Sequence, residues 1–170
     1  MPATFEPIHR LHHFAWRCRD AEETRAFYED LLGLPLTHLI RAETVPSTGE
    51  HCPYVHLFFG LEDGSSIAFF DLGDSQAALP SPNTPAWVNH LALKVGSPES
   101  LDRAKDRLEA AGIDVLGVTD HGFVRSIYFF DPNGIRLELT ADMAEGKVSD
   151  SDRSTARAKL DAWITEKAGR

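Results

Sequence analysis

The chain has 170 residues, of which 42% are hydrophobic, so it can bury one good core as a single domain or as two small fused modules. Its formal net charge is −9, with 26 acidic residues against 17 lysines and arginines and no basic run, which argues against a nucleic-acid partner and against an anionic membrane surface. The two cysteines have no metal-binding spacing, the first residues lack an apolar signal segment, and no apolar run reaches membrane length. We therefore expect a soluble, cytoplasmic protein.

The first half of the chain predicts a strand, a capped helix and three further strands. Residues 11–19 alternate between apolar and polar side chains, as a strand does. Asp20 is suited to cap a helix over 21–32, because Glu23 completes a capping box and Gly33 ends the helical pattern. The later strands are expected over residues 36–40, 54–59 and 65–72. The Pro-rich residues 78–87 indicate a linker.

After the linker the same order of elements returns. Residues 89–95 predict a strand, and Ser97 and Pro98 open a helix that runs to residue 111. The remaining segments are a short strand over 113–118, a hairpin over 119–139 and a helix over 151–168. The C-terminal helix has an apolar stripe that we expect to cover the domain or a partner subunit.

The two halves match each other as an internal repeat. HFAWRC at 13–18 matches HLALKV at 90–95, and each is followed by a capped helix, a glycine and three apolar strands. The sequence therefore predicts two βαβββ units within a single domain spanning 1–170. Its parts are module one at about 8–77, a linker at about 78–87, module two at about 88–141 and a helical extension over 142–170.

The hairpin over 119–139 carries one tyrosine and one glutamate on otherwise apolar strands. If its loop is the three residues Pro132 to Gly134, Tyr128 falls opposite Glu138 on one face. A four-residue loop would pair Ile127 with Glu138 instead. A lone acid on an apolar strand is costly to bury unpaired, so Glu138 is either a solvated edge residue or a functional one.

The repeat places a histidine at the start of each unit, and these two residues form a candidate metal site with Glu138. Alternation along the strand directs His12 to the face opposite His13, and the register of the repeat favours His13 over His12. Two imidazoles and one carboxylate leave open positions on a metal, a set that suits Fe(II) oxygen chemistry. The predicted ligands are therefore His13, His90 and Glu138, with Fe(II) favoured and Mn, Zn, Ni or Co as alternatives.

These residues resemble the vicinal oxygen chelate superfamily, which includes glyoxalases, fosfomycin and bleomycin resistance proteins and extradiol dioxygenases. The resemblance covers residues 8–140. It implies an α+β fold in which two paired βαβββ modules form a cupped, half-open mixed β-barrel with flanking helices, here followed by a C-terminal helix. It also implies metal binding at the positions of His13, His90 and Glu138.

Within the superfamily, the hairpin resembles the signature of type I extradiol ring-cleavage dioxygenases. That signature is met here by Thr119, His121, Ile127, Tyr128, Asp131, Pro132, Gly134 and Glu138. The resemblance implies that Tyr128 hydrogen-bonds a catechol oxygen at the metal and that His121 contacts substrate or assists proton transfer. The other reading of Tyr128 is a strand aromatic facing water, and that of His121 a turn residue before Gly122.

One feature departs from that subfamily. Extradiol enzymes of this type usually carry an acid–base histidine on the last strand of the first module, whereas Ser65 and Ser66 stand at that place here. His56, on the preceding strand, is a candidate substitute. The same strand offers no acid at the fourth-ligand position of glyoxalase I, since the nearest one, Asp71, lies beyond it.

We therefore expect an extradiol-type dioxygenase that cleaves a catechol or similar vicinal diol with O2. The alternatives are another metal-dependent lyase, isomerase or epimerase of the superfamily, or a non-catalytic module that binds a small molecule. The expected partners are a small aromatic substrate and O2, without nucleic acid or membrane. By analogy alone, we also expect a homodimer or a larger homo-oligomer.

Overall fold

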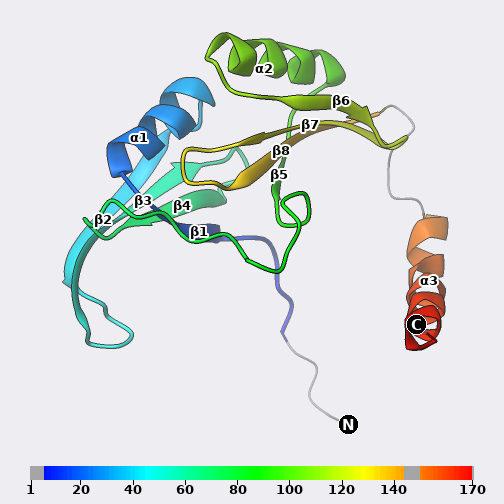
Figure 1. The fold of residues 1–170 in the computed structure, drawn as a ribbon, viewed down its shortest axis with the longest axis horizontal. Helices are drawn as coiled ribbons and strands as arrows, with labels where there is room; N and C mark the ends of the chain where they lie inside the picture. Colours follow the sequence, from blue (N-terminus) through cyan, green and yellow to red (C-terminus); the bar gives the residue numbers. More distant parts are fainter. Residues whose placement is uncertain (1–5, 144–149, 170) are drawn as a thin grey trace. The chain divides into compact units, whose positions relative to one another are not determined.

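The chain folds into two compact units, each built around a four-stranded sheet (Figure 1). The computed structural model describes residues 6–143 and 150–169, without the side chains of residues 150–152. The first unit comprises Met1–Leu91 and Phe130–Leu137, and the second comprises Ala92–Phe129 and Glu138–Arg170.

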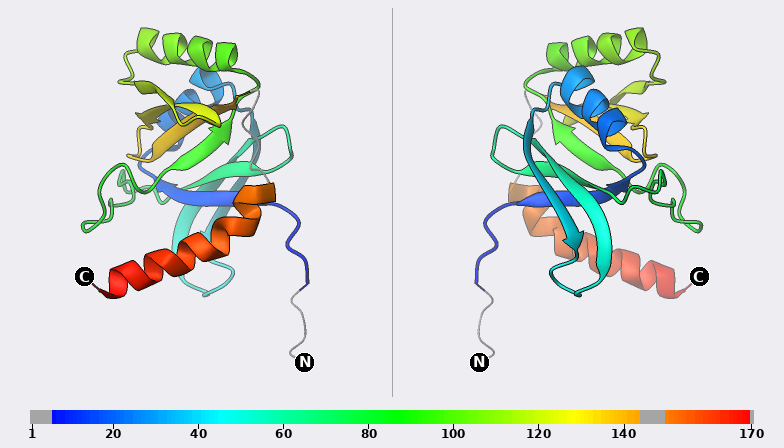
Figure 2. Two further views of the ribbon diagram at one scale, coloured as in Figure 1. Left: turned by 90° about the vertical axis from the view of Figure 1, so that its right-hand side faces the viewer. Right: turned by 90° about the vertical axis from the view of Figure 1, so that its left-hand side faces the viewer.

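The first sheet has the strand order β1-β4-β3-β2. Its strands are β1 (His13–Cys18), β2 (Leu36–Thr44), β3 (His51–Gly60) and β4 (Ser66–Asp71). Strand β1 is parallel to β4, whereas β2–β3 and β3–β4 are antiparallel, so the sheet is mixed. Figure 2 shows β2 and β3 side by side up to the loop that joins them.

One face of this sheet is covered by the helical segment that follows β1. It begins as α1 (Ala21–Arg25), where Asp20 Oδ1 accepts a hydrogen bond from Glu23 N at 2.7 Å, and continues as the π-helix η1 (Ala26–Leu31). The capping box is only half formed, because the Glu23 carboxylate pairs with Arg19. From η1 the fully buried Tyr28 ring packs on Phe59 and Phe69, with centroids 5.3 and 4.9 Å away.

The second sheet has the order β5-β8-β7-β6. Its strands are β5 (Leu91–Lys94), β6 (Leu116–Asp120), β7 (Val124–Phe130) and β8 (Arg136–Asp142). Helix α2 (Pro98–Ala110) lies between β5 and β6 in the chain, and Ser97 Oγ caps it by accepting from Ser100 N at 3.2 Å. Leu101 and Leu108 are the buried side chains of α2.

The predicted α+β fold of two βαβββ modules with a C-terminal helix is confirmed, the last element being α3 (Asp150–Ala168). Residues 78–87 contain neither helix nor strand. Two boundaries matter for the site: β1 begins at His13 itself, and β5 begins directly after His90. Within the described residues, no helix combines the length and the apolar character needed to cross a membrane.

Candidate functional site

The hairpin of β7 and β8 has the three-residue loop. Asp131 N donates to Ile135 O at 3.0 Å, which closes the chain around residues 132–134, and Gly134 takes a φ of +82° that favours glycine. Counting back from the 131–135 pair places Tyr128 opposite Glu138. The two side chains share a face, since Tyr128 Oη donates to Glu138 Oε1 at 3.2 Å.

Tyr128 also links Glu138 to His121 in a short polar chain. His121 follows directly after β6, and its Nε2 lies 2.9 Å from Tyr128 Oη. Because the Tyr128 hydroxyl donates to the carboxylate, it can accept a hydrogen bond from His121 Nε2. Glu138 is only 8% exposed, whereas His121 lies at the surface. A phenol between an imidazole and a carboxylate can pass or hold a proton at one oxygen atom.

His13 is the first residue of β1, and its imidazole contacts other aromatic rings of the first unit. Its centroid lies 5.5 Å from that of Phe58 and 5.9 Å from that of His56, both on β3. The expectation that His12 points to the opposite face is wrong, because His12 Nδ1 and His13 Nδ1 are 2.7 Å apart. Strand alternation does not reach His12, which precedes β1.

His56 lies in a largely buried, aromatic environment on β3. It is 8% exposed, and its ring stacks on Phe70 with centroids 3.7 Å apart. Burial, followed by the nearby His13 and His38, lowers the pKa of His56 to about 4. The imidazole is therefore neutral at pH 7.

His90 has the tautomer that a metal ligand needs. Its Nδ1 lies 3.0 Å from the carbonyl oxygen of Val88, and a carbonyl only accepts, so Nδ1 carries the proton. In the neutral ring the lone pair is then on Nε2, the form in which imidazole binds a metal while the other nitrogen is fixed by a hydrogen bond.

The predicted metal ligands are divided between the units, with His13 and His90 in the first and Glu138 in the second. In the described part of the chain, no group of three or more His, Cys, Asp or Glu residues has the arrangement of a metal site. By residue type, two imidazoles and a buried carboxylate fit a divalent transition metal. The ligand set His13, His90 and Glu138 remains a prediction.

The three residues that bear on the subfamily, Ser65, Ser66 and Asp71, lie just before β4 and at its two ends. Ser66 is in register with His13, whereas Ser65 belongs to the preceding turn and donates from its hydroxyl to Asp63 Oδ1 at 2.6 Å. Asp71 Oδ2 accepts from Ala21 N at 2.8 Å, so this carboxylate holds the start of α1.

A family comparison covers most of the chain. Residues 10–139 match the model described as "Glyoxalase/Bleomycin resistance protein/Dioxygenase superfamily". The chain belongs to this superfamily. A solved structure described as a glyoxalase/dioxygenase from Nostoc punctiforme superposes on this member with a TM-score of 0.62 at 25% identity, covering 84% of this chain and 99% of the other.

Two curated relatives of this superfamily member are named as dioxygenases. The Bacillus subtilis protein with the provisional name ring-cleaving dioxygenase MhqA is 28% identical over 143 residues, which are 82% of this chain and 42% of that protein. Biphenyl-2,3-diol 1,2-dioxygenase of Paraburkholderia xenovorans is 28% identical over 135 residues, 75% of this chain and 39% of that enzyme. The chain thus spans about two fifths of the length of these relatives.

Asp131, the first residue of the turn Asp131–Gly134, has a structural role as a hydrogen-bond acceptor. Buried Asp131 accepts hydrogen bonds from Tyr28 Oη at 3.0 Å, Asn133 N at 2.9 Å and Ile135 N at 2.7 Å. Burial raises the pKa of Asp131, while these hydrogen bonds act in the opposite direction. Tyr28 was not predicted as a partner of Asp131, because the two residues are 103 positions apart in the sequence.

Proposed function

We propose that the protein is a metal-dependent extradiol-type dioxygenase that cleaves a catechol or a similar vicinal diol with O2. The observation that supports this most is the hydrogen-bonded chain from His121 through Tyr128 to Glu138. His121 and Tyr128 are the residues that separate the extradiol signature from endings shared across the superfamily. The dioxygenase names of the two curated relatives support the same activity.

In this proposal His13, His90 and Glu138 hold Fe(II), with Mn, Zn, Ni or Co as alternatives. When bound, the metal would supply Lewis-acid and redox chemistry for the reaction of the diol with O2. Val88 O would orient His90, and the Tyr128 hydroxyl would orient the Glu138 carboxylate. Both contacts would orient the ligand side chains in the absence of substrate.

Tyr128 and His121 would handle the substrate proton. The Tyr128 hydroxyl can turn from Glu138 towards a substrate oxygen, and His121 can take up or return a proton through Nε2. Ring cleavage places both atoms of O2 in the product and breaks a carbon–carbon bond beside the diol, so it needs no external reductant.

Turnover of catechol tests the proposal. The Fe(II)-loaded protein should give a yellow ring-opened product in air and none under nitrogen. Glu138→Gln should abolish the product, while His51→Ala, at an exposed position on β3, serves as the matched control and should leave it unchanged. Failure of the wild-type protein to form product in air would contradict the proposal.

The serines at the start of β4 favour a second candidate, a metal-dependent lyase, isomerase or epimerase that uses the same three ligands. Such a reaction would not depend on the acid–base histidine of the extradiol enzymes, which Ser65 and Ser66 replace here. Turnover with Ni, Co or Zn in the absence of O2 would select this candidate over the first.

A further inference from the structure

His56 carries a buried nitrogen that the fold does not use. The residue is 8% exposed, and its Nε2 has no hydrogen-bond partner among the described residues. Leaving such an atom unpaired in a protein interior destabilises the native state, so most buried polar atoms are paired. An unpaired nitrogen at this place suits a ligand better than it suits the fold.

The ring of His56 is held firmly by aromatic neighbours. It stacks on Phe70 with an interplanar angle of 18°, and its centroid lies 4.2 Å from that of Phe58. It also meets His13 edge to face. The contact with His13 shows that His56 lies on the same face of the first sheet as the predicted ligand. That face is opposite the one that packs on Tyr28 through Phe59 and Phe69.

The strand register adds a second unpaired nitrogen beside the first. Phe70 on β4 is paired with His56 on β3 and with Arg17 on β1, so these three residues form one row across the sheet. Arg17 Nε is the other buried side-chain nitrogen without a partner in the described part of the chain, although its Nη2 pairs with Asp74. Two unpaired nitrogens flanking one aromatic ring suit an oxygen-bearing aromatic ligand.

We infer that His56 is a substrate-contacting residue whose Nε2 hydrogen-bonds an oxygen of the aromatic diol bound on the His13 face of the first sheet. This inference rests on the proposed function and deepens it, because it assigns a substrate contact to β3 where β4 offers only serine. The Phe70 ring beneath the imidazole fixes its plane, and the Arg17–Phe70–His56 row provides the surface for the ligand ring.

Two substitutions separate this role from a packing role. His56→Phe keeps a flat ring between Phe58 and Phe70 but removes the nitrogen, and His56→Gln restores a polar group near the position of Nε2. His51→Phe makes the same chemical change at an exposed site on the same strand. Catechol binding to each Fe(II)-loaded protein is measured by calorimetry under nitrogen, where no turnover occurs, together with iron content and the midpoint of thermal unfolding.

His56→Phe should raise the Kd for catechol at least tenfold, keep its iron and unfold at a higher temperature than the wild type. His56→Gln should recover most of the affinity, and His51→Phe should bind as the wild type does. Unchanged affinity in His56→Phe would overturn the inference, as would loss of iron, which would make His56 a metal ligand. A lower unfolding temperature would overturn it too, because the ring would then serve the fold.

Failure of the proposed function gives a different pattern. If the wild-type protein binds no catechol, the proposed substrate is wrong. The midpoint of thermal unfolding then decides alone whether His56 Nε2 serves a ligand or the fold. A more stable His56→Phe variant would then support a ligand-directed nitrogen, and an equally or less stable one would overturn it.

Discussion

At the scale of single residues, one hydroxyl group decides how specific the proposed activity is. Tyr128 Oη lies within hydrogen-bond distance of both His121 Nε2 and Glu138 Oε1. A metal site without this hydroxyl could serve many reactions of the superfamily. With it, a substrate oxygen can meet a proton donor that is already aligned by two side chains.

Tyr128→Phe should therefore lower kcat for catechol, expressed per bound iron, about 100-fold, a typical loss for a general acid or base. Steady-state kinetics and metal analysis of the same preparation measure both quantities. Tyr54→Phe, a tyrosine on β3, is the matched control and should retain kcat. A Tyr128→Phe variant with wild-type kcat would show that the hydroxyl has no part in turnover.

The two cysteines should differ sharply in reactivity. Cys18 is 1% exposed, and burial raises the pKa of its thiol to about 11, whereas Cys52 is partly exposed. Iodoacetamide at pH 8 should therefore modify one thiol per native chain and two in denaturant, as counted by mass spectrometry. The Cys52→Ser variant should take up no label while folded. Labelling of native Cys18 would contradict the packing around β1.

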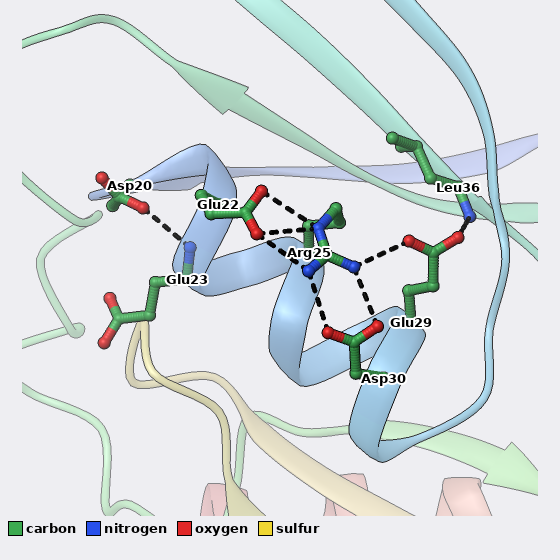
Figure 3. Close-up of polar contacts among 7 residues, drawn as sticks. All are labelled: Asp20, Glu22, Glu23, Arg25, Glu29, Asp30 and Leu36. Carbon is green, nitrogen blue, oxygen red and sulfur yellow. Dashed lines mark hydrogen bonds and ion pairs between the residues drawn. The ribbon is translucent and has the colours of Figure 1, made fainter.

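At the scale of elements, Arg25 forms ion pairs within the helical segment α1–η1, which lies between β1 and β2. Figure 3 shows Arg25 bonded to Glu22, Glu29 and Asp30, and Glu29 accepting from Leu36 N at the start of β2. Hydrogen bonds from Arg25 lower the pKa values of Glu22 and Asp30. For Glu29 the hydrogen bond from Leu36 N is the larger cause, and Arg25 adds to it.

Arg25→Met should lower the unfolding temperature at pH 7 but much less at pH 3. Carboxylates whose pKa is lowered by folding stabilise the native state above their ordinary pKa, and this stabilisation is lost as the pH falls. Thermal unfolding of both proteins between pH 3 and pH 7 measures the difference. A gap between them that does not shrink at low pH would assign the effect of Arg25 to packing instead of charge.

The same segment shows where sequence patterns stop being informative. Asp20 and Ser97 mark their helices correctly because a capping side chain and its backbone donor are three residues apart in the sequence. The π-helical turn of η1 was not predicted, since the apolar spacing fits an ordinary helix. Its extra residue per turn lets adjacent Phe27 and Tyr28 both be buried, and Tyr28 thereby reaches Asp131.

At the scale of the whole molecule, the repeat was the most informative signal. Matching HFAWRC to HLALKV predicted two βαβββ modules and placed His13 and His90 at corresponding positions. In the structure His13 is the first residue of β1, and His90 directly precedes β5. The register of the last hairpin followed from loop length, because only a three-residue loop pairs Tyr128 with Glu138. The sequence offered His56 only as a candidate substitute for the missing acid–base histidine, because its aromatic contacts and its unpaired Nε2 depend on how neighbouring strands are paired.

The C-terminal helix carries the remaining expectation, a homo-oligomer. Three apolar side chains of α3 are each about half exposed, namely Leu160, Trp163 and Ile164. A helix that covers a partner subunit would show such exposed apolar side chains in the single chain. The oligomeric state remains a prediction that light scattering of the purified protein can measure.

Isotope labelling tests the central claim, dioxygenolytic cleavage of a vicinal diol, most directly. The Fe(II)-loaded protein is mixed with catechol under ¹⁸O2, and the ring-opened product is analysed at once by mass spectrometry. We expect dioxygenolytic cleavage to place both atoms of ¹⁸O2 in the product, apart from label lost by exchange of the aldehyde oxygen with water. A product without any ¹⁸O, or turnover that proceeds equally well under nitrogen, would contradict it.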